Sequence, residues 1–267
     1  MASAVAEPET ETENGSESPD QGSDTLVGHL LELKSRITRA MGAVLLGFGI
    51  AYPFKERIFG FLIGPMTRVL PEKSSFIFTN PAEAFFTYLK ITLLAGFMLA
   101  IPVVLYQFWA FVAPGLYRSE RRVFFPVLLL SVSLFFIGAA FSFFLVFPLA
   151  FKFLVSFAND QIMAMPTMKE YLGFSITLLL AFGASFQVPI VCMALVRLGV
   201  VTVAGLRAKR RYVFAGAFIL AALITPPDVV SQVLLGFPIW ILYELGILLS
   251  LRIKKRADEE EEAVETE

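Results

Sequence analysis

The sequence has few of the residues that catalyse reactions or bind metals. It contains one cysteine, Cys192, and one histidine, His29, in 267 residues. One cysteine cannot form a disulfide within the chain, and a zinc site needs several cysteine or histidine ligands. Neither GxxxxGKS/T nor GxGxxG, the patterns of phosphate-binding loops, occurs. We therefore expect a protein that is not an enzyme and that holds no metal or cofactor.

Charged residues are also scarce. They make up 17% of the chain, whereas soluble proteins average about 25%. Hydrophobic residues make up 57%, against about 45–50% in a soluble domain. The charges lie outside the long apolar runs, which is typical of a membrane protein. The net charge of −1 indicates no general attraction to nucleic acid, so we expect no nucleic-acid partner.

The two ends of the chain are acidic and differ from its middle. Residues 1–24 contain five glutamates and lack the basic start and apolar core of a cleavable signal peptide. This composition predicts a disordered N-terminal segment over 1–24. A membrane domain over 25–256 and a solvated acidic tail over 257–267 follow.

Six apolar segments predict an all-α membrane protein that crosses the bilayer six times. A spanning helix needs about 20 mostly apolar residues. The segments are 39–54, 85–112, 123–151, 171–196, 212–225 and 229–251, and we expect the fifth and sixth helices to be short. The longest loop, 55–84, contains an apolar patch that favours partial structure.

The fifth and sixth segments are separated only by Pro226, Pro227 and Asp228. Two prolines interrupt a helix, and an aspartate is a good residue for starting the next one. A single kinked helix through both segments would far exceed the bilayer thickness. The sequence therefore favours a tight helical hairpin.

The distribution of basic residues predicts the orientation. Cytoplasmic segments of membrane proteins are enriched in lysine and arginine. If the N-terminus is cytoplasmic, the inner segments hold 15 of the 22 basic residues, within 34–39, 118–122, 197–211 and 252–256. We expect both termini in the cytoplasm and the 55–84 loop outside.

Two cytoplasmic segments contain glutamates of interest. Leu26, Leu30, Leu33 and Ile37 share one helix face, which predicts an amphipathic helix in the interface before the first span. Glu32 lies on another face, and it is either a binding group or simply the partner of a basic residue four positions later.

The second glutamate of interest is Glu120, which begins the third span in a loop that is aromatic at one end and charged at the other. A carboxylate there is either a binding group or a residue that interacts favourably with the helix dipole. The sequence leaves both alternatives open.

Several motifs together resemble one known family. HLLELKSR (29–36), YQFWAFVAPGLYRSERR (106–122), FPLAF (147–151), SFQVP (185–189) and TPPDVVSQ (225–232) occur in order. They are similar to motifs of the TatC family, the core subunit of the twin-arginine protein translocase. The resemblance implies a cupped six-span fold in the bacterial inner membrane and a role in binding twin-arginine signal peptides of folded precursors. It also implies oligomeric assembly and a drive from the proton-motive force.

The resemblance implies a signal-binding site and a partner-docking site. Glutamates that match Glu32 and Glu120 receive the paired arginines, and a carboxylate can accept two parallel bonds from a guanidinium. Lys34 stands where many relatives have arginine. The signal-binding set is Glu32, Lys34, Phe111, Leu116, Glu120 and Arg121, and the docking set for small single-span subunits of TatA/TatB type is Thr225, Asp228 and Gln232. The alternative for the second set is capping and bonding within the hairpin turn.

Two polar residues lie inside apolar segments. Gln187 stands where some relatives have glutamate and cannot titrate, and its alternative role is a hydrogen bond between helices. Glu244 is costly in a membrane unless it is paired. It marks either an inner helix end or an interhelical contact, and extension toward Arg252 is the simpler explanation.

Two other function classes are less well supported. A secondary transporter needs ionisable groups or broken helices near the bilayer centre, where this sequence offers chiefly Gln187. An intramembrane enzyme needs a nucleophile with its base, or metal ligands.

Overall fold

The computed structural model describes residues 20–70, 76–77, 79–112, 121–157, 165–225 and 229–265. Within these ranges every regular element is a helix, apart from one isolated bridge between Ile77 and Thr167. The predicted all-α class is therefore confirmed. The elements are α1 (Asp20–Ala51), η1 (Tyr52–Phe54), α2 (Lys55–Thr67), α3 (Pro81–Val112), α4 (Arg121–Phe141), η2 (Ser142–Val146), α5 (Phe147–Val155), α6 (Met168–Ser185), α7 (Val188–Arg197), α8 (Val203–Ala208), α9 (Arg210–Ile224) and α10 (Val229–Glu265).

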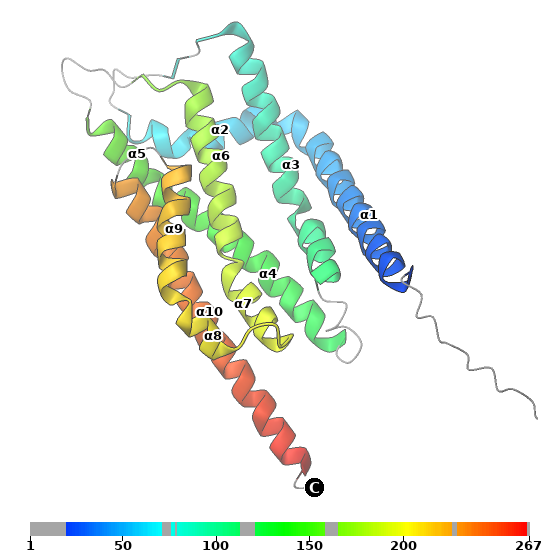
Figure 1. The fold of residues 1–267 in the computed structure, drawn as a ribbon. Coiled ribbons are helices and arrows are strands. Elements are labelled where there is room, and N and C mark those ends of the chain that lie inside the picture. The colour runs from blue at the N-terminus through cyan, green and yellow to red at the C-terminus, as the bar shows by residue number, and fades with distance from the viewer. Residues whose placement is uncertain are drawn as a thin grey trace, which may run out of the picture.

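Five stretches of the described chain are long and apolar enough to cross a membrane. They are Leu30–Thr67, Pro81–Val112, Phe124–Val155, Met168–Arg197 and Val229–Arg252. The remaining predicted span, the fifth along the chain, is α9, whose 15 residues extend about 23 Å at 1.5 Å per residue, less than the roughly 30 Å of the hydrocarbon core. Helices α9 and α10 pack side by side as the predicted hairpin (Figure 1), and the prediction of a short fifth span is confirmed.

The sixth helix is longer than predicted. Helix α10 has 37 residues because it continues past its apolar part, Val229–Arg252, into the acidic tail as far as Glu265. The start of α1 and the end of α10 lie at the same end of the molecule as the connection between α3 and α4 (Figure 1). This arrangement agrees with an even number of crossings.

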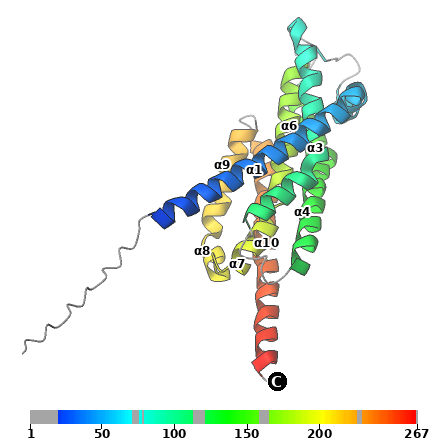
Figure 2. The same cartoon turned by 90° about the vertical axis from the view of Figure 1, so that its right-hand side faces the viewer.

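The first helix is continuous where two helices were predicted. Helix α1 starts at Asp20 and runs without a break to Ala51, so the predicted boundary after residue 24 falls inside it and no separate interfacial helix precedes the span. No proline occurs between Pro19 and Pro53, and nothing else interrupts the helical hydrogen bonds. Helix α1 crosses the other helices at an angle (Figure 2).

Helices α1 and α3 approach closely at two glycines. A Cβ added to Gly47 would overlap the carbonyl of Gly96, and a Cβ added to Gly96 would overlap the backbone of Phe48. Small residues allow such contacts between helices in a membrane. The glycine pair therefore positions the N-terminal helix against the rest of the molecule.

Prolines interrupt the third and fourth spans. The third span contains the π-helical turn Ser142–Val146, directly before Pro148 in α5, where a wider turn accommodates the missing N–H and the proline ring. The fourth span divides at Phe186 and Gln187 into α6 and α7, and Pro189 lies in the first turn of α7. Both spans are therefore kinked.

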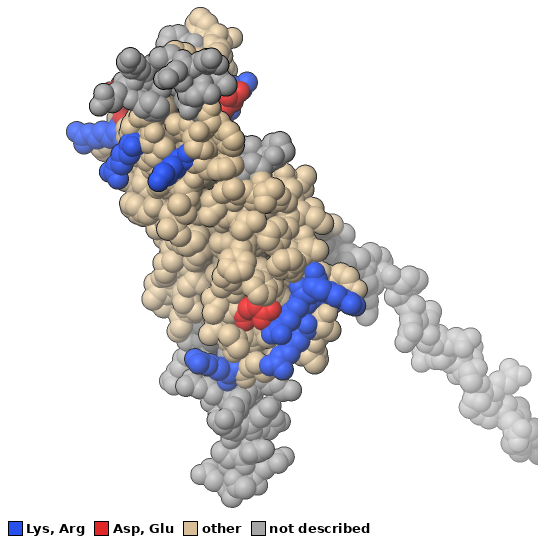
Figure 3. All heavy atoms as spheres, turned by 90° about the vertical axis from the view of Figure 1, so that its left-hand side faces the viewer, with Lys and Arg blue, Asp and Glu red and all other residues tan. Residues whose placement is uncertain are grey.

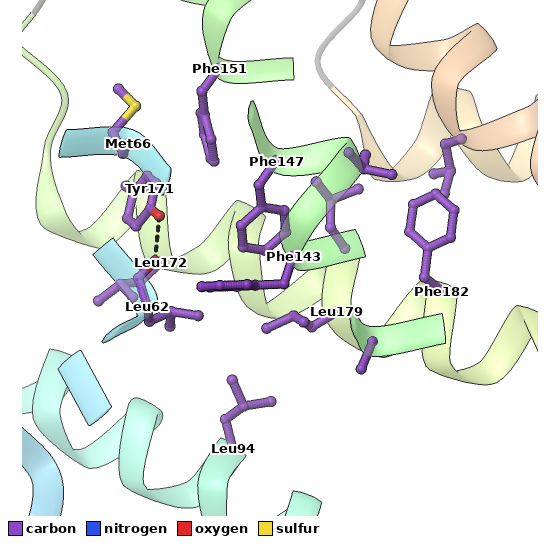
Figure 4. Close-up of a cluster of buried hydrophobic side chains, with 14 of the residues drawn as sticks. Leu62, Met66, Leu94, Phe143, Phe147, Phe151, Tyr171, Leu172, Leu179 and Phe182 are labelled. Carbon is purple, nitrogen blue, oxygen red and sulfur yellow. Dashed lines mark hydrogen bonds between the residues drawn. The ribbon is translucent and has the colours of Figure 1, made fainter. Parts of the chain in front are cut away.

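The main hydrophobic cluster joins α2 to the third and fourth spans. Its members include Leu62 and Met66 of α2, Phe147 of α5, and Tyr171 and Phe182 of α6 (Figure 4). The Tyr171 hydroxyl donates a hydrogen bond of 2.7 Å to the Leu62 carbonyl. The 55–84 loop is thus partly helical and packed, as its apolar patch predicted.

Charged side chains gather near the two ends of the molecule. On the face shown in Figure 3, lysine and arginine form two groups that are separated by a broad uncharged band. Such a band is the surface that hydrocarbon requires.

Candidate functional site

The carboxylate of Glu32 already binds a guanidinium. Helix α1 places Arg36 one turn after Glu32, and the Arg36 Nε and Nη2 atoms both donate to Oε1 of Glu32, at 3.0 and 2.6 Å. The Glu32 side chain is 42% exposed. The Arg36 side chain is 20% exposed, and exposed pairs with this spacing stabilise a helix by about 0.3–0.5 kcal/mol. The predicted pairing with the residue four positions later is present.

Two other members of the predicted signal-binding set have described side chains, Lys34 and Phe111. Lys34 is exposed on α1, and Phe111 is half-buried in the last turn of α3. Leu116 and Glu120 lie outside the described residues. Arg121 begins α4, but its side chain is outside the described part of the chain. The structure therefore places the start of α1 and the flanks of this connection at one end of the molecule (Figure 1).

Trp109 holds the last turns of α3 against α4. Its indole Nε1 donates to Ser131 Oγ at 2.8 Å, and both residues are buried. A buried tryptophan usually finds a partner for its N–H. This contact fixes the helix that leads into the connection between α3 and α4.

Gln187 joins the fourth span to α4. Its Nε2 donates to the Ser131 carbonyl at 2.9 Å, so the alternative of an interhelical hydrogen bond is confirmed. Its Oε1 is buried and has no hydrogen-bond partner among the described residues. The residue precedes α7 directly and lies at the break between α6 and α7.

The hairpin turn uses two of its polar residues internally. Thr225 is buried and donates to the Ala221 carbonyl at 2.9 Å, and Gln232 Nε2 donates to the Phe218 carbonyl at 3.1 Å. The alternative of bonding within the hairpin is therefore confirmed for these two residues. Asp228 lies outside the described residues. Around the turn, Leu223 and Val229 are 79% and 75% exposed.

The partner of Glu244 is Arg210. The Arg210 Nη2 atom lies 2.7 Å from Glu244 Oε2, so the predicted extension toward Arg252 is wrong and the contact is interhelical. The reason is the hairpin, because Arg210 and Glu244 are each 17 positions from Pro227 and the two helices run antiparallel. The sequence could have indicated this pair, because two residues equally far from the turn of a helical hairpin lie at the same level along the two helices.

The sequence analysis missed one carboxylate. Glu83 is 7% exposed and accepts three hydrogen bonds. The donors are the Thr79 N–H at 2.8 Å and hydroxyl at 3.0 Å, and the Lys169 N–H at 2.8 Å. The nearby Asn80 Oδ1 accepts from the Ala82 N–H at 2.9 Å. This motif is a typical helix start, so the sequence could have indicated the local contacts but not the distant Lys169.

The Glu83 contacts belong to a junction between two distant segments. The Ile77 N–H donates to the Pro166 carbonyl at 3.2 Å, and the Met168 N–H donates to the Ile77 carbonyl at 3.1 Å. Glu83 thus connects the start of α3 to the start of α6. In the described part of the chain, no three His, Cys, Asp or Glu side chains are grouped so as to hold a metal ion.

Comparison with known sequences agrees with these features. The family model described as Sec-independent protein translocase protein (TatC) matches residues 28–238. A Sec-independent protein translocase protein TatC from Desulforapulum autotrophicum is 49% identical over 239 residues, which is 89% of this chain and 88% of that protein. The protein of the same name from Escherichia coli K12 is 42% identical over 225 residues, which is 84% of this chain and 87% of that protein.

Two solved structures share the fold. A crystal structure of a twin-arginine translocase receptor, TatC, has a TM-score of 0.75 and 42% identity, covering 83% of this chain and 97% of that one. A second crystal structure of such a receptor, in DDM, has a TM-score of 0.77 and 42% identity, covering 83% and 99%. Sequence motifs, helix order and full-length similarity therefore agree that this chain belongs to the TatC family of Sec-independent protein translocase proteins.

Proposed function

We propose that this chain is the subunit of the twin-arginine translocase that binds the twin-arginine signal peptide of folded precursors. One observation carries the proposal: the half-exposed Glu32 carboxylate is held by the guanidinium of Arg36 on the same helix. An incoming signal arginine offers the same group, so it can take the place of Arg36. The Glu32 carboxylate is then paired with a guanidinium both before and after the signal peptide binds.

The second arginine of the signal binds Glu120 in this proposal. Two arginines need two carboxylates at the same depth, and a guanidinium forms two parallel bonds with each. Lys34, Phe111, Leu116 and Arg121 complete the site. The common location of the start of α1 and the flanks of the connection between α3 and α4 supports it (Figure 1).

The hairpin of α9 and α10 is the proposed docking region for the small single-span subunits of TatA/TatB type. The exposed apolar side chains near the turn, among them Leu223 and Val229, and the short α9 support this proposal. Thr225, Asp228 and Gln232 would supply polar contacts there, and polar residues bond across helices in a membrane. The resulting complex is oligomeric.

The proposed setting is the bacterial inner membrane with both chain ends in the cytoplasm. The 15 of 22 basic residues in the inner segments support this orientation. The sequence contains no phosphate-binding loop of the two patterns considered, and transport in this family is expected to use the proton-motive force.

Site-specific photo-crosslinking tests the proposal. A photoreactive residue at position 120 or 32 should capture a radiolabelled twin-arginine precursor and should capture much less of a twin-lysine precursor. Capture of both precursors to the same extent would contradict signal recognition. A solute-uptake assay tests the alternative that the protein is a secondary transporter.

A further inference from the structure

A hollow in the surface of the molecule has an entirely apolar lining. It has a volume of about 870 Å³ and lies between the end of α1, α2, α3 and the third span. Its floor includes the buried residues Leu62, Leu94 and Ala139, and exposed Phe61 and Phe144 stand at its sides. None of the described side chains that line it can donate a hydrogen bond. A ligand inside this groove must therefore itself be apolar along its length.

Small side chains create the groove. Ala95 on α3 and Ala139 and Ala140 on α4 lie where larger residues would fill the space. Phe61 of α2 stacks on Phe143 with ring centroids 4.5 Å apart, which closes one side. The groove therefore follows from how α2 packs on the third span, and its volume is in the range of sites for small molecules.

A cationic side chain, Lys55, belongs to the first turn of α2, next in the sequence to a residue that lines the groove. Lys55 begins α2 and lies between Phe54 and Ile58, which both line the groove. The Lys55 Nζ lies 4.7 Å from the ring centroid of Tyr52 and 5.8 Å from that of Tyr88. Among the described residues, no carboxylate lies within ion-pair distance of it. An amine held over two rings at a membrane interface is well placed for an anion.

We propose that this groove holds one phospholipid with an anionic headgroup, its acyl chain against the alanines and its phosphate group near Lys55. The apolar lining matches the acyl chain of such a molecule, and the charge of Lys55, next to Phe54 of the lining, matches its headgroup. A second transmembrane helix is a poorer match, because a helix with side chains is about 10–12 Å wide and the groove is closed on one side by stacked rings. The lipid belongs to the leaflet away from the chain ends, since α2 lies at that end of the molecule (Figure 1).

Native mass spectrometry of the detergent-purified chain tests this inference. The protein is titrated with phosphatidylglycerol and, separately, with phosphatidylcholine of the same acyl chains. The parent should retain one phosphatidylglycerol per chain. Ala140→Trp, at an exposed position of the lining, should reduce retention of both lipids about tenfold by occupying the apolar space.

Two further variants distinguish binding of the lipid's acyl chain from binding of its headgroup. Lys55→Gln should lower retention of phosphatidylglycerol to the level of phosphatidylcholine, because it removes only the charge contact. Leu129→Trp, on the same helix at a 60% exposed position outside the groove, should retain lipid as the parent does. Equal retention by Ala140→Trp and the parent, or equal loss in Leu129→Trp, would overturn the proposal.

Photo-crosslinking in membranes decides the identity of the occupant. A photoreactive residue at position 140 in the full chain should yield a lipid adduct. A crosslink to a single-span protein helix would show that the groove is a protein interface and that the lipid proposal is wrong. The assay does not depend on binding of a signal peptide, so its outcome is independent of the proposed function.

Discussion

The two ends of the molecule use carboxylates in different ways. At the end where α3 and α6 begin, Glu83 is buried and accepts three hydrogen bonds from Thr79 and Lys169. At the end where α1 starts and α10 ends, Glu32 and Glu244 are partly exposed and each binds an arginine. Bonds from backbone N–H groups cannot be exchanged without unfolding, whereas an exposed pair can change its partner. One end therefore holds its carboxylate rigidly, and the other, called the recognition end below, carries the proposed signal-binding site.

The largest effect is expected in an experiment on the membrane topology. Reporter fusions after residue 70 and after residue 205 should report opposite sides of the membrane, with residue 205 in the cytoplasm. The reason is the concentration of basic residues at the recognition end. If both fusions report the same side, the six-span arrangement and the contrast between the two ends are both wrong.

Signal binding should depend strongly on the recognition end. Glu120→Gln should weaken binding of a twin-arginine signal roughly ten- to a hundredfold, which is what a charge-assisted pair of about 1.5–3 kcal/mol contributes. Glu32→Gln should act in the same direction and more weakly, because Arg36 shares its carboxylate. Affinity for a labelled signal peptide is the measurement.

A double-mutant cycle supplies the control for Glu120. A twin-lysine signal should bind weakly to the parent and lose little more with Glu120→Gln, since groups in one contact are not additive. Fully additive losses would mean that the arginines and Glu120 do not share a contact. Thermal unfolding of Glu120→Gln should match the parent within about 1 kcal/mol.

Stability should depend on the opposite end. Glu83→Gln should lower the melting temperature of the purified protein by several degrees, because an amide cannot accept as strongly from all three donors. Glu244→Gln, the matched control in a partly exposed pair, should lower it by much less. Equal shifts in the two variants would show that the two carboxylates contribute equally to stability.

Partner association should be affected separately from stability. Gln232→Leu should reduce co-purification of the small subunits several-fold while protein abundance changes little, since its bond to the Phe218 carbonyl contributes only about 0.6–2 kcal/mol. The control is Thr177→Val, at an exposed position of α6, because it also removes a side-chain bond to a helix carbonyl, that of Gly173. Unchanged co-purification of the Gln232 variant would count against docking at the hairpin.

The smallest effect is expected inside the bundle. Gln187→Leu removes the bond to the Ser131 carbonyl but also removes a buried oxygen that has no partner among the described residues. Loss of the bond should destabilise the fold and loss of the unpaired oxygen should stabilise it. The melting temperature should therefore shift by less than it does in Glu83→Gln. A larger shift would indicate that Gln187 stabilises the fold as much as the contacts of the rigid end do.

Features that depend on local chemistry could be predicted from the sequence. The approximate limits of the apolar segments follow from the length and composition that a bilayer imposes on each helix. The hairpin follows from Pro226 and Pro227, since proline acts on its own backbone. The matching motifs indicated the family and the residues of the proposed sites.

The contacts between distant residues became known only from the packing of the helices. The backbone N–H of Lys169 reaches Glu83 from 86 positions away, and Arg210 reaches Glu244 across the hairpin. The continuity of α1 and the groove beside α2 also depend on packing, because they follow from which surfaces cover each other. Such contacts arise from the arrangement of whole helices, and a single sequence does not display that arrangement.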